Sequence, residues 1–277
     1  MAGDTKTGVG LSGCKTRIIV VKECNPKTSE DTEKFIGEFA KLSMLCLMAS
    51  SHKCGFSVPG HLSMDASGRQ YSREYIVGET LESQLCSAGW NTTSVAHDII
   101  KILDSIAAGP LLCTSMIDTT DYFLYLLNDS MSSVEEGNTL ETWNAIRARI
   151  HSADFPKVEF GFNHGDLAFD NIIVDPDRKL WLIDPLVNKI ETPWWDVGKV
   201  LQSTYCNWPA LKAGIVDAPS PGLLSIAENV LLTHDRRTSM FFLMLVLLRI
   251  IRHAPKQEQK RAILTEATRI GMEYLEQ

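Results

Sequence analysis

One segment of the sequence, from Phe162 to Pro185, constrains the chain more than any other. It contains the triplet His164-Gly165-Asp166, and Asn171 follows five positions after the aspartate. Two short apolar runs come next, joined by a turn rich in aspartate and proline, and Asp184 ends the second run. The runs predict two strands and the turn residues predict a tight reversal, so the segment is expected to form a loop followed by a β-hairpin.

The polar residues of this segment are those that phosphoryl transfer requires. Transfer from ATP needs a carboxylate beside the acceptor hydroxyl and oxygen ligands that hold Mg²⁺ against the phosphates. Asp166, Asn171 and Asp184 supply that set. Magnesium keeps several waters, so one Asn and one Asp suffice beside phosphate oxygens. The alternative is a polar loop and a turn that contain these residues without a catalytic role.

The same residues resemble the signature of a known family, the aminoglycoside phosphotransferase and choline kinase group, which are small-molecule relatives of protein kinases. Its H-G-D-x-x-x-x-N pattern is matched from His164 to Asn171, and its following I-D by Ile183-Asp184. The resemblance implies that Asp166 is the catalytic base and that Asn171 and Asp184 are metal ligands. It further implies that His164 braces the catalytic loop, and that ATP and Mg²⁺ are the cofactors.

A second part of the resemblance lies in the segment from Pro193 to Val200. The family has an aspartate there that opens a helix, and Asp196 would bond backbone groups of the catalytic loop. Another interpretation makes Asp196 an acid in the first turn of a helix, where it interacts favourably with the helix dipole. The two interpretations are compatible.

The N-terminal region contains candidates for residues that hold a nucleotide. Kinase-like folds use a strand lysine to grip ATP phosphates and a helix glutamate to orient it. Lys22 ends the strand predicted over 17–22, and Glu38 lies inside the helix predicted over 29–50, with Glu33 as its nearest rival. The alternative is that Lys22 is a solvated residue at the end of a strand.

A glycine-containing stretch near the N-terminus also resembles part of a kinase. Gly8 to Gly13 has the form G-x-G-x-x-G, whose glycines let backbone N–H groups approach phosphates. The resemblance assigns phosphate contacts to Gly10, Ser12 and Gly13. A strand follows this stretch, which favours a kinase glycine-rich loop over a dinucleotide-binding fold. Only a short polar stretch precedes Gly8, which leaves little room for a strand ahead of the loop.

The stretch from Arg73 to Leu81 resembles the hinge between kinase lobes, where backbone groups read the adenine edge. Glu74 and Ile76 are the positions that the resemblance assigns to this contact. As ordinary structure the stretch is a strand, predicted over 73–77, followed by the start of a helix.

The order of the predicted elements indicates an α+β protein with two unequal lobes. Residues 1–78 mix strands with one helix and form the expected nucleotide-binding lobe, while residues 79–277 form a larger, mainly helical catalytic and substrate-binding lobe. In that second part helices are predicted over 92–108, 121–127, 139–150, 195–205, 223–232, 239–252 and 256–276. With the family resemblance, the expected architecture is a bilobal protein-kinase-like fold.

Composition excludes several other classes of protein. The formal charge is −7 and no long basic run occurs, which disfavours a nucleic-acid partner. Seven scattered cysteines without a C-x-x-C pair predict a reducing, cytoplasmic environment. The longest apolar run, Met240 to Leu248, falls short of the ~20 residues that span a bilayer and predicts a buried helix instead of membrane attachment.

The short distance between two aspartates favours a small-molecule acceptor. Protein kinases place a long peptide-binding segment between the metal-binding aspartate and the later helix aspartate, whereas Asp184 and Asp196 are twelve positions apart. Nearby Trp194, Trp195 and Trp208 are candidates for a substrate cage or, alternatively, for packing anchors. The expected function is phosphorylation of an aminoglycoside-, choline- or sugar-like hydroxyl. The alternatives are a pseudokinase that serves as a nucleotide-binding interaction module, and an atypical protein kinase; the oligomeric state is not indicated.

Overall fold

The computed structural model of the chain describes residues 4–12, 17–25, 28–50, 54–60, 62–86, 90–133, 144, 148 and 155–276. Contacts divide the chain into two compact units. The first consists of Met1–Gly89 and His164–Lys189, and the second of Trp90–Asn163 and Ile190–Gln277. The segment with the H-G-D triplet therefore belongs to the same unit as the N-terminal part of the chain. The lobe boundary expected at residue 78 stays a prediction.

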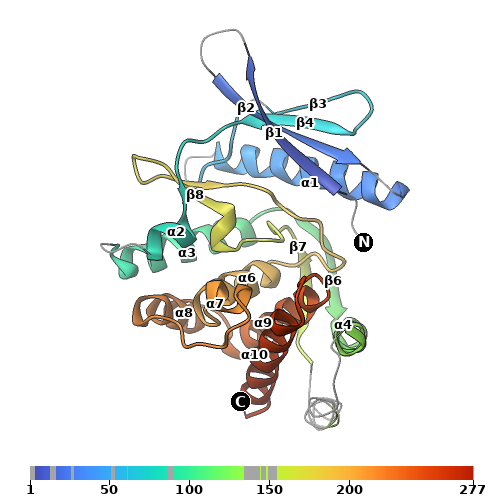
Figure 1. Cartoon of the computed structure of the whole chain (residues 1–277), viewed down its shortest axis with the longest axis vertical. Helices are drawn as coiled ribbons and strands as arrows, with labels where there is room; N and C mark the ends of the chain where they lie inside the picture. Colours follow the sequence, from blue (N-terminus) through green and yellow to red (C-terminus); the bar gives the residue numbers. More distant parts are fainter. Residues whose placement is uncertain are drawn as a thin grey trace. The chain divides into compact units, whose positions relative to one another are not determined.

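The first unit contains an antiparallel four-stranded sheet and one long helix. The strands, in the order β1-β2-β4-β3, are β1 (Asp4–Ser12), β2 (Arg17–Asn25), β4 (Gln70–Glu74) and β3 (Ser63–Met64). Helix α1 (Ser29–Ala49) runs along one face of this sheet (Figure 1). Its Phe35 and Phe39 rings lie 5.0 and 5.5 Å from the ring of Tyr71 on β4, which buries the apolar side of the helix.

The predicted helix over 29–50 is confirmed, and the sequence shows why it begins where it does. Thr28 accepts a hydrogen bond from the Asp31 N–H at 3.2 Å, while the Asp31 carboxylate accepts one from the Thr28 N–H at 3.0 Å. This reciprocal capping satisfies two donors that a helix start otherwise leaves without partners. The strand predicted over 17–22 is also confirmed, within β2.

Two strand predictions in this unit were wrong. The nine-residue strand β1 includes residues 8–12, which were expected to form a glycine-rich loop with little room for a strand ahead of it. They form a strand because pairing with β2 along its whole length supplies backbone hydrogen bonds that the polar and glycine residues do not indicate. The strand predicted over 73–77 lies earlier, at Gln70–Glu74. Val77 is 65% exposed, so its apolar side chain does not mark a buried strand position.

A second, smaller sheet completes the first unit. It pairs β5 (Glu79–Thr80), β8 (Ile172–Val174) and β9 (Leu180–Leu182), with α2 (Leu81–Cys86) and the 3₁₀ helix η1 (Phe169–Asn171) beside it. The predicted hairpin is confirmed as β8 and β9. Asp175 holds its turn: one carboxylate oxygen accepts N–H groups of Asp177 and Lys179, both at 2.9 Å, and the other accepts the Trp181 indole N–H at 2.8 Å.

The second unit is mainly helical. Its helices are α3 (Thr92–Ala107), α4 (Thr120–Ser133), α6 (Trp194–Thr204), α7 (Trp208–Lys212), α8 (Pro221–Thr233), α9 (Arg236–Ile251) and α10 (Gln257–Glu276). Met240 to Leu248 of α9 are buried on every side, as predicted for a core helix, with α4, α6, α8 and α10 packed around it. A Cβ on Gly198 of α6 would lie 2.9 Å from the backbone of Phe242, so α6 and α9 cross closely there.

The mainly helical prediction for this part missed one pair of strands. β6 (Leu111–Asp118) and β7 (Lys157–Gly161) form a separate antiparallel sheet. Of the helix expected over 139–150, only Asn144 and Ala148 lie within the described residues, and both are helical. Among the described helices, none has the length and apolar character needed to cross a membrane.

Candidate active site

The loop that begins with His164 is held by hydrogen bonds to its own residues and to the end of the β-hairpin. His164 is fully buried; its Nδ1 accepts the Asp166 N–H at 3.3 Å, so its Nε2 donates to the Ile183 carbonyl at 3.0 Å. Burial lowers the pKa of His164 to about 4, although Asp166 acts in the opposite direction. A neutral imidazole therefore ties the loop to the strand end that precedes Asp184.

Asp166 and Asn171 are joined directly. The Asn171 Nδ2 group donates to the Asp166 backbone oxygen at 2.8 Å and to its carboxylate Oδ2 at 2.9 Å. These two bonds use both amide hydrogens, which leaves the Asn171 Oδ1 as the atom that can ligate a cation. The predicted spacing of the two residues is thus realised as a contact, formed because η1 turns the chain back after Asp166.

Asp184 follows β9 and is placed by an unusual backbone conformation. Its φ is +53°, in the left-handed region that non-glycine residues seldom adopt, although aspartate is among the more tolerant. After it the chain is fixed by two side chains: Lys41 of α1 donates to the Leu186 carbonyl at 2.8 Å, and Asn188 donates to the Gly165 carbonyl at 3.1 Å. These bonds link the segment after Asp184 both to α1 and to the loop of Asp166.

Lys22, Glu38 and Asp184 meet although they come from β2, α1 and the end of β9. The Lys22 Nζ lies 3.6 Å from the Glu38 Oε2 and 3.5 Å from the Asp184 Oδ1. Burial alone would lower the pKa of Lys22, but the neighbouring Asp184, Tyr71 and Glu38 outweigh it, and the pKa is raised. Burial raises the pKa of Glu38, and Lys22 only partly offsets this effect. The ammonium is therefore held charged between two carboxyl groups.

The donor set fits Mg²⁺. The Asn171 Oδ1 and the partly exposed Asp184 carboxylate are hard oxygen ligands of the kind this cation prefers. Within the described parts of the chain no group of three or more His, Cys, Asp and Glu side chains has the arrangement of a metal site. A cation that takes its remaining ligands from phosphate oxygens and water needs no such group.

The glycine-containing stretch lies mostly within a strand. Gly10 pairs with Ile19, and Ser12 with Arg17, in the β1–β2 hairpin, whereas Gly13 lies outside the described residues. Gly10 and Ser12 thus lie near the end of β1, just before the chain connects to β2. A loop that covers phosphates would form at this connection. Their phosphate contacts stay a prediction.

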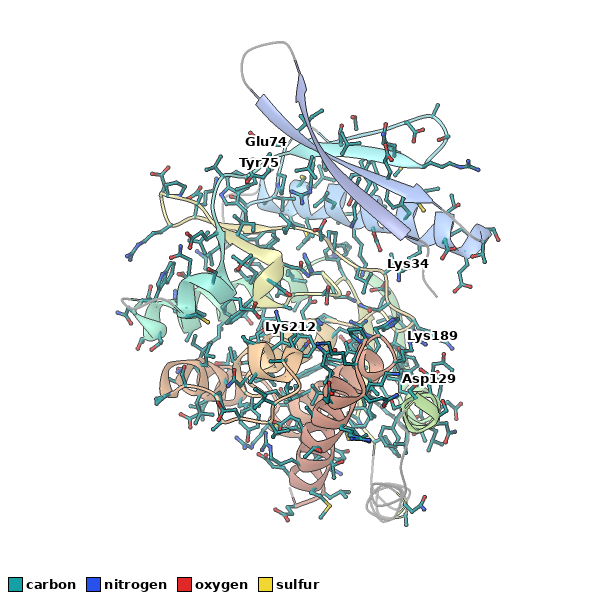
Figure 2. All side chains as sticks on the ribbon, in the orientation of Figure 1. Lys34, Glu74, Tyr75, Asp129, Lys189 and Lys212 are labelled. Carbon is teal, nitrogen blue, oxygen red and sulfur yellow. The ribbon has the colours of Figure 1, made fainter. Side chains whose placement is uncertain are left out.

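The hinge candidates lie where β4 ends, as the labelled Glu74 and Tyr75 show in Figure 2. The Glu74 N–H donates to the Gly60 carbonyl at 2.9 Å, and its Oε2 accepts the Gly60 N–H at 3.3 Å. Ile76 comes just after the strand. At Gly78 a Cβ would stand 2.3 Å from the Val174 carbonyl oxygen, so only glycine allows this approach of the chain to β8. The base contacts of Glu74 and Ile76 stay a prediction.

The remaining candidates belong to the second unit. Asp196 is buried in the first turn of α6, and its bonds to the catalytic loop stay a prediction. Trp195 is fully buried, with its ring 5.7 Å from Phe242 and the guanidinium of Arg249 4.8 Å away, as a packing anchor would be. Trp194 also packs against Phe242, at 6.4 Å. The alternative of packing is therefore favoured for Trp195.

Sequence reasoning missed Arg73, although it lies in the first unit with the other site residues. Its NH2 group is 3.7 Å from the Asp184 Oδ1, and the residue is only 7% exposed. The signal was present: an arginine in a strand stands next to the hinge candidate Glu74. Lys41 and Asn188 were missed as well, because their partners are backbone oxygens that no side-chain pattern reveals.

Comparison with known proteins gives one partial sequence relative. No protein-family model matches the chain. The 3-deoxy-D-manno-octulosonic acid kinase of Vibrio parahaemolyticus serotype O3:K6 (strain RIMD 2210633) is 26% identical over 139 residues, which are 44% of this chain and 55% of the relative. The similarity thus spans about half of the relative's length.

Solved structures are similar along nearly the whole chain. A thermostable mutant of aminoglycoside phosphotransferase APH(4)-Ia, in ternary complex with AMP-PNP and hygromycin B, matches with a TM-score of 0.63 at 11% identity, over 98% of this chain and 93% of that one. The streptomycin–ATP ternary complex of APH(2'')-IIa matches with a TM-score of 0.58 at 16% identity, over 95% and 91%.

These matches identify the fold. The chain has the bilobal protein-kinase-like fold of the aminoglycoside phosphotransferases, with a small N-terminal β-sheet lobe that carries one helix and a larger, mainly helical C-terminal lobe. The fold class expected from the sequence is confirmed, as is the resemblance to these phosphotransferases at the level of the fold.

Proposed function

We propose that this protein is an ATP- and Mg²⁺-dependent phosphotransferase that moves the γ-phosphate to a hydroxyl group of a small molecule. The observation that carries the proposal is the meeting of Lys22, Glu38 and Asp184 from three distant elements, in the same unit as the bonded pair Asp166 and Asn171. A cation, its orienting acid, two oxygen ligands and a carboxylate base are together the parts that positioning and charge neutralisation of phosphates require.

Each side chain has a separate part in the proposed reaction. Asp166, oriented by its bond from Asn171, accepts the proton of the acceptor hydroxyl. Asn171 and Asp184 would hold Mg²⁺, and the cation would supply positive charge that neutralises the phosphates. Lys22, aligned by Glu38, binds phosphate oxygens. His164 keeps the loop of Asp166 fixed to the strand end before Asp184 and stays neutral, so it adds no charge to the centre.

The proposed acceptor is a hydroxylated small molecule of the sugar or amino-sugar kind. The neighbouring structures contain hygromycin B or streptomycin, and the sequence relative is named a kinase of an acidic sugar. The short distance between Asp184 and Asp196 supports the same acceptor class, since it leaves no room for a long peptide-binding segment. The nucleotides in those neighbours, ATP and AMP-PNP, support ATP as the donor.

The test is transfer of label from γ-³²P-ATP with Mg²⁺ to a panel of sugars, acidic sugars, aminoglycosides and amino alcohols, with slow ATP hydrolysis as a second readout. Asp166→Asn should lower the transfer rate by about 10²- to 10⁴-fold, the usual contribution of a general base. Asp177→Asn is the matched control, because Asp177 is an exposed aspartate in the nearby hairpin turn. It should leave the rate unchanged.

Three outcomes would count against the proposal. Equal rates for the wild type and Asp166→Asn would remove the catalytic assignment. MgATP binding without transfer to any acceptor would favour the nucleotide-binding interaction module. Label that appears on protein and never on a small molecule would favour an atypical protein kinase.

A further inference from the structure

Arg73 occupies a position that a strand normally gives to an apolar residue. Along β4 every second residue is buried: Tyr71 and Arg73 are 1% and 7% exposed, whereas Gln70 is exposed and Ser72 and Glu74 are half-buried. Placing a charged group where water is excluded is unfavourable unless ionic or hydrogen-bonding partners surround it. The ionic and hydrogen-bonding partners of Arg73 therefore indicate its role.

Those partners do not satisfy the guanidinium group. The contact to the Asp184 Oδ1, at 3.7 Å, is longer than the 2.7–2.9 Å typical of charge-assisted hydrogen bonds. The buried Nε–H has no hydrogen-bond partner among the described residues. A guanidinium carries five N–H donors in a planar fork that matches carboxylate and phosphate oxygens. Among the described residues Arg73 thus keeps buried donors that its long contact to Asp184 does not use, and a further anion could accept from them.

The charges around Asp184 lead to the same conclusion. Two cations, Lys22 and Arg73, lie within 3.5 and 3.7 Å of the same carboxylate oxygen, and Glu38 is the second acid beside Lys22. These two positive and two negative groups balance only while Asp184 neutralises Arg73. If Asp184 ligates a divalent cation, Arg73 loses this counter-ion, and the group of side chains acquires surplus positive charge that an incoming polyanion can neutralise.

We propose that Arg73 is a second phosphate-binding cation, which together with Lys22 binds the polyphosphate chain of a nucleoside triphosphate. This inference rests on the proposed function, because it assumes that Asp184 holds Mg²⁺ and that a nucleotide enters this site. It extends that function by assigning phosphate recognition to a residue of β4 outside the family signature. The competing role is recognition of the purine base, since Arg73 directly precedes the hinge candidate Glu74.

The experiment measures nucleotide affinity by calorimetry for the wild type and for Arg73→Met, which keeps the length of the side chain and removes its charge. Adenosine, ADP, ATP and GTP are titrated with Mg²⁺, and inorganic tripolyphosphate serves as a probe without a base. The Kd for MgATP should rise by about 10- to 100-fold, as expected for loss of hydrogen bonds to a charged group. The Kd for tripolyphosphate should rise similarly, whereas the Kd for adenosine should rise by less than about twofold.

Arg69→Met is the matched control, because Arg69 stands just before β4 with an exposed side chain and the same charge is removed. It should leave every Kd unchanged. Arg73→Lys should recover part of the affinity for MgATP, since it restores the charge without the fork. If Arg73→Met does not fold, this lysine variant decides the question: affinity for all phosphate ligands that equals the wild type would mean that the donors of the guanidinium are not used.

The outcomes separate this inference from the proposed function. A wild type that binds neither MgATP nor MgGTP overturns the proposed function and the inference with it. A wild type that binds MgATP, beside an Arg73→Met variant with the same affinity, overturns the inference alone. Equal weakening of adenosine and ATP, or a changed ratio of ATP to GTP affinity, would show that Arg73 reads the base and would also overturn it.

Discussion

His164 should make the stability of the protein depend on pH in a defined window. Its pKa is lowered from 6.5 to about 4 in the folded chain, mainly by burial. Between these two values the unfolded chain binds a proton that the folded chain does not, so the free energy of unfolding falls as the pH falls. Below about pH 4 this decrease in the free energy of unfolding is complete. It amounts to about 3 kcal/mol, since one pKa unit corresponds to about 1.4 kcal/mol.

The perturbation is His164→Gln, measured by chemical denaturation at several pH values from 7 to 4. The variant is expected to be less stable at pH 7, because the substitution removes the buried imidazole of His164 and the two hydrogen bonds that it makes. The difference in unfolding free energy between wild type and variant should then shrink by about 1.4 kcal/mol per pH unit below pH 6.5. All carboxylates common to both proteins cancel in this difference.

A matched control and a direct probe sharpen the test. His97→Gln replaces a histidine of α3 whose side chain is 81% exposed, and it reports the effect of the substitution itself. NMR of the His164 ring should show the proton on Nε2, as its bond to the Ile183 carbonyl requires. A stability difference that stays constant between pH 7 and pH 4.5 would refute the reasoning, because it would mean that His164 takes up its proton equally in both states.

Three further predictions concern other contacts. Glu38→Gln should weaken MgATP binding about tenfold in calorimetry, because Lys22 loses its ion pair with Glu38; unchanged affinity would argue against an orienting role. Gly198→Ala should destabilise the protein by about 1–3 kcal/mol in thermal unfolding, since its Cβ would press on backbone atoms, whereas Gly222→Ala, whose Cβ meets side-chain atoms of Thr92 and Ser220, should cost less. Gly165→Ala should cost about 1–2 kcal/mol, because Gly165 has a φ of +85°, and a neutral result would contradict that backbone conformation.

Local patterns in the sequence predicted the elements whose stability comes from nearby residues. Helix α1 begins at Ser29 because Thr28 and Asp31 cap each other, and both are neighbours in the chain. The β8–β9 hairpin forms around Asp175, whose side chain bonds residues two, four and six positions later. Such interactions are encoded within a few residues, so a sequence pattern indicates them directly.

Elements that depend on distant partners were predicted poorly. β1 consists largely of polar and glycine residues and becomes a strand because β2 offers a complete ladder of backbone groups. β6 and β7 are separated by more than thirty residues, and each is regular only through the other. Strand propensity depends on such neighbours more than on the residues themselves, which is why these strands were missed.

The same distinction applies to the candidate site. By itself the sequence determined that Asp166 and Asn171 lie together, because they are five positions apart and their bond forms within one turn of the loop. Only the tertiary structure decided which cations face Asp184: Lys22 is 162 positions away along the chain, and Arg73 reaches it from a different strand. Long-range electrostatic contacts of this kind depend on how strands and helices pack, and no local pattern of residues specifies them.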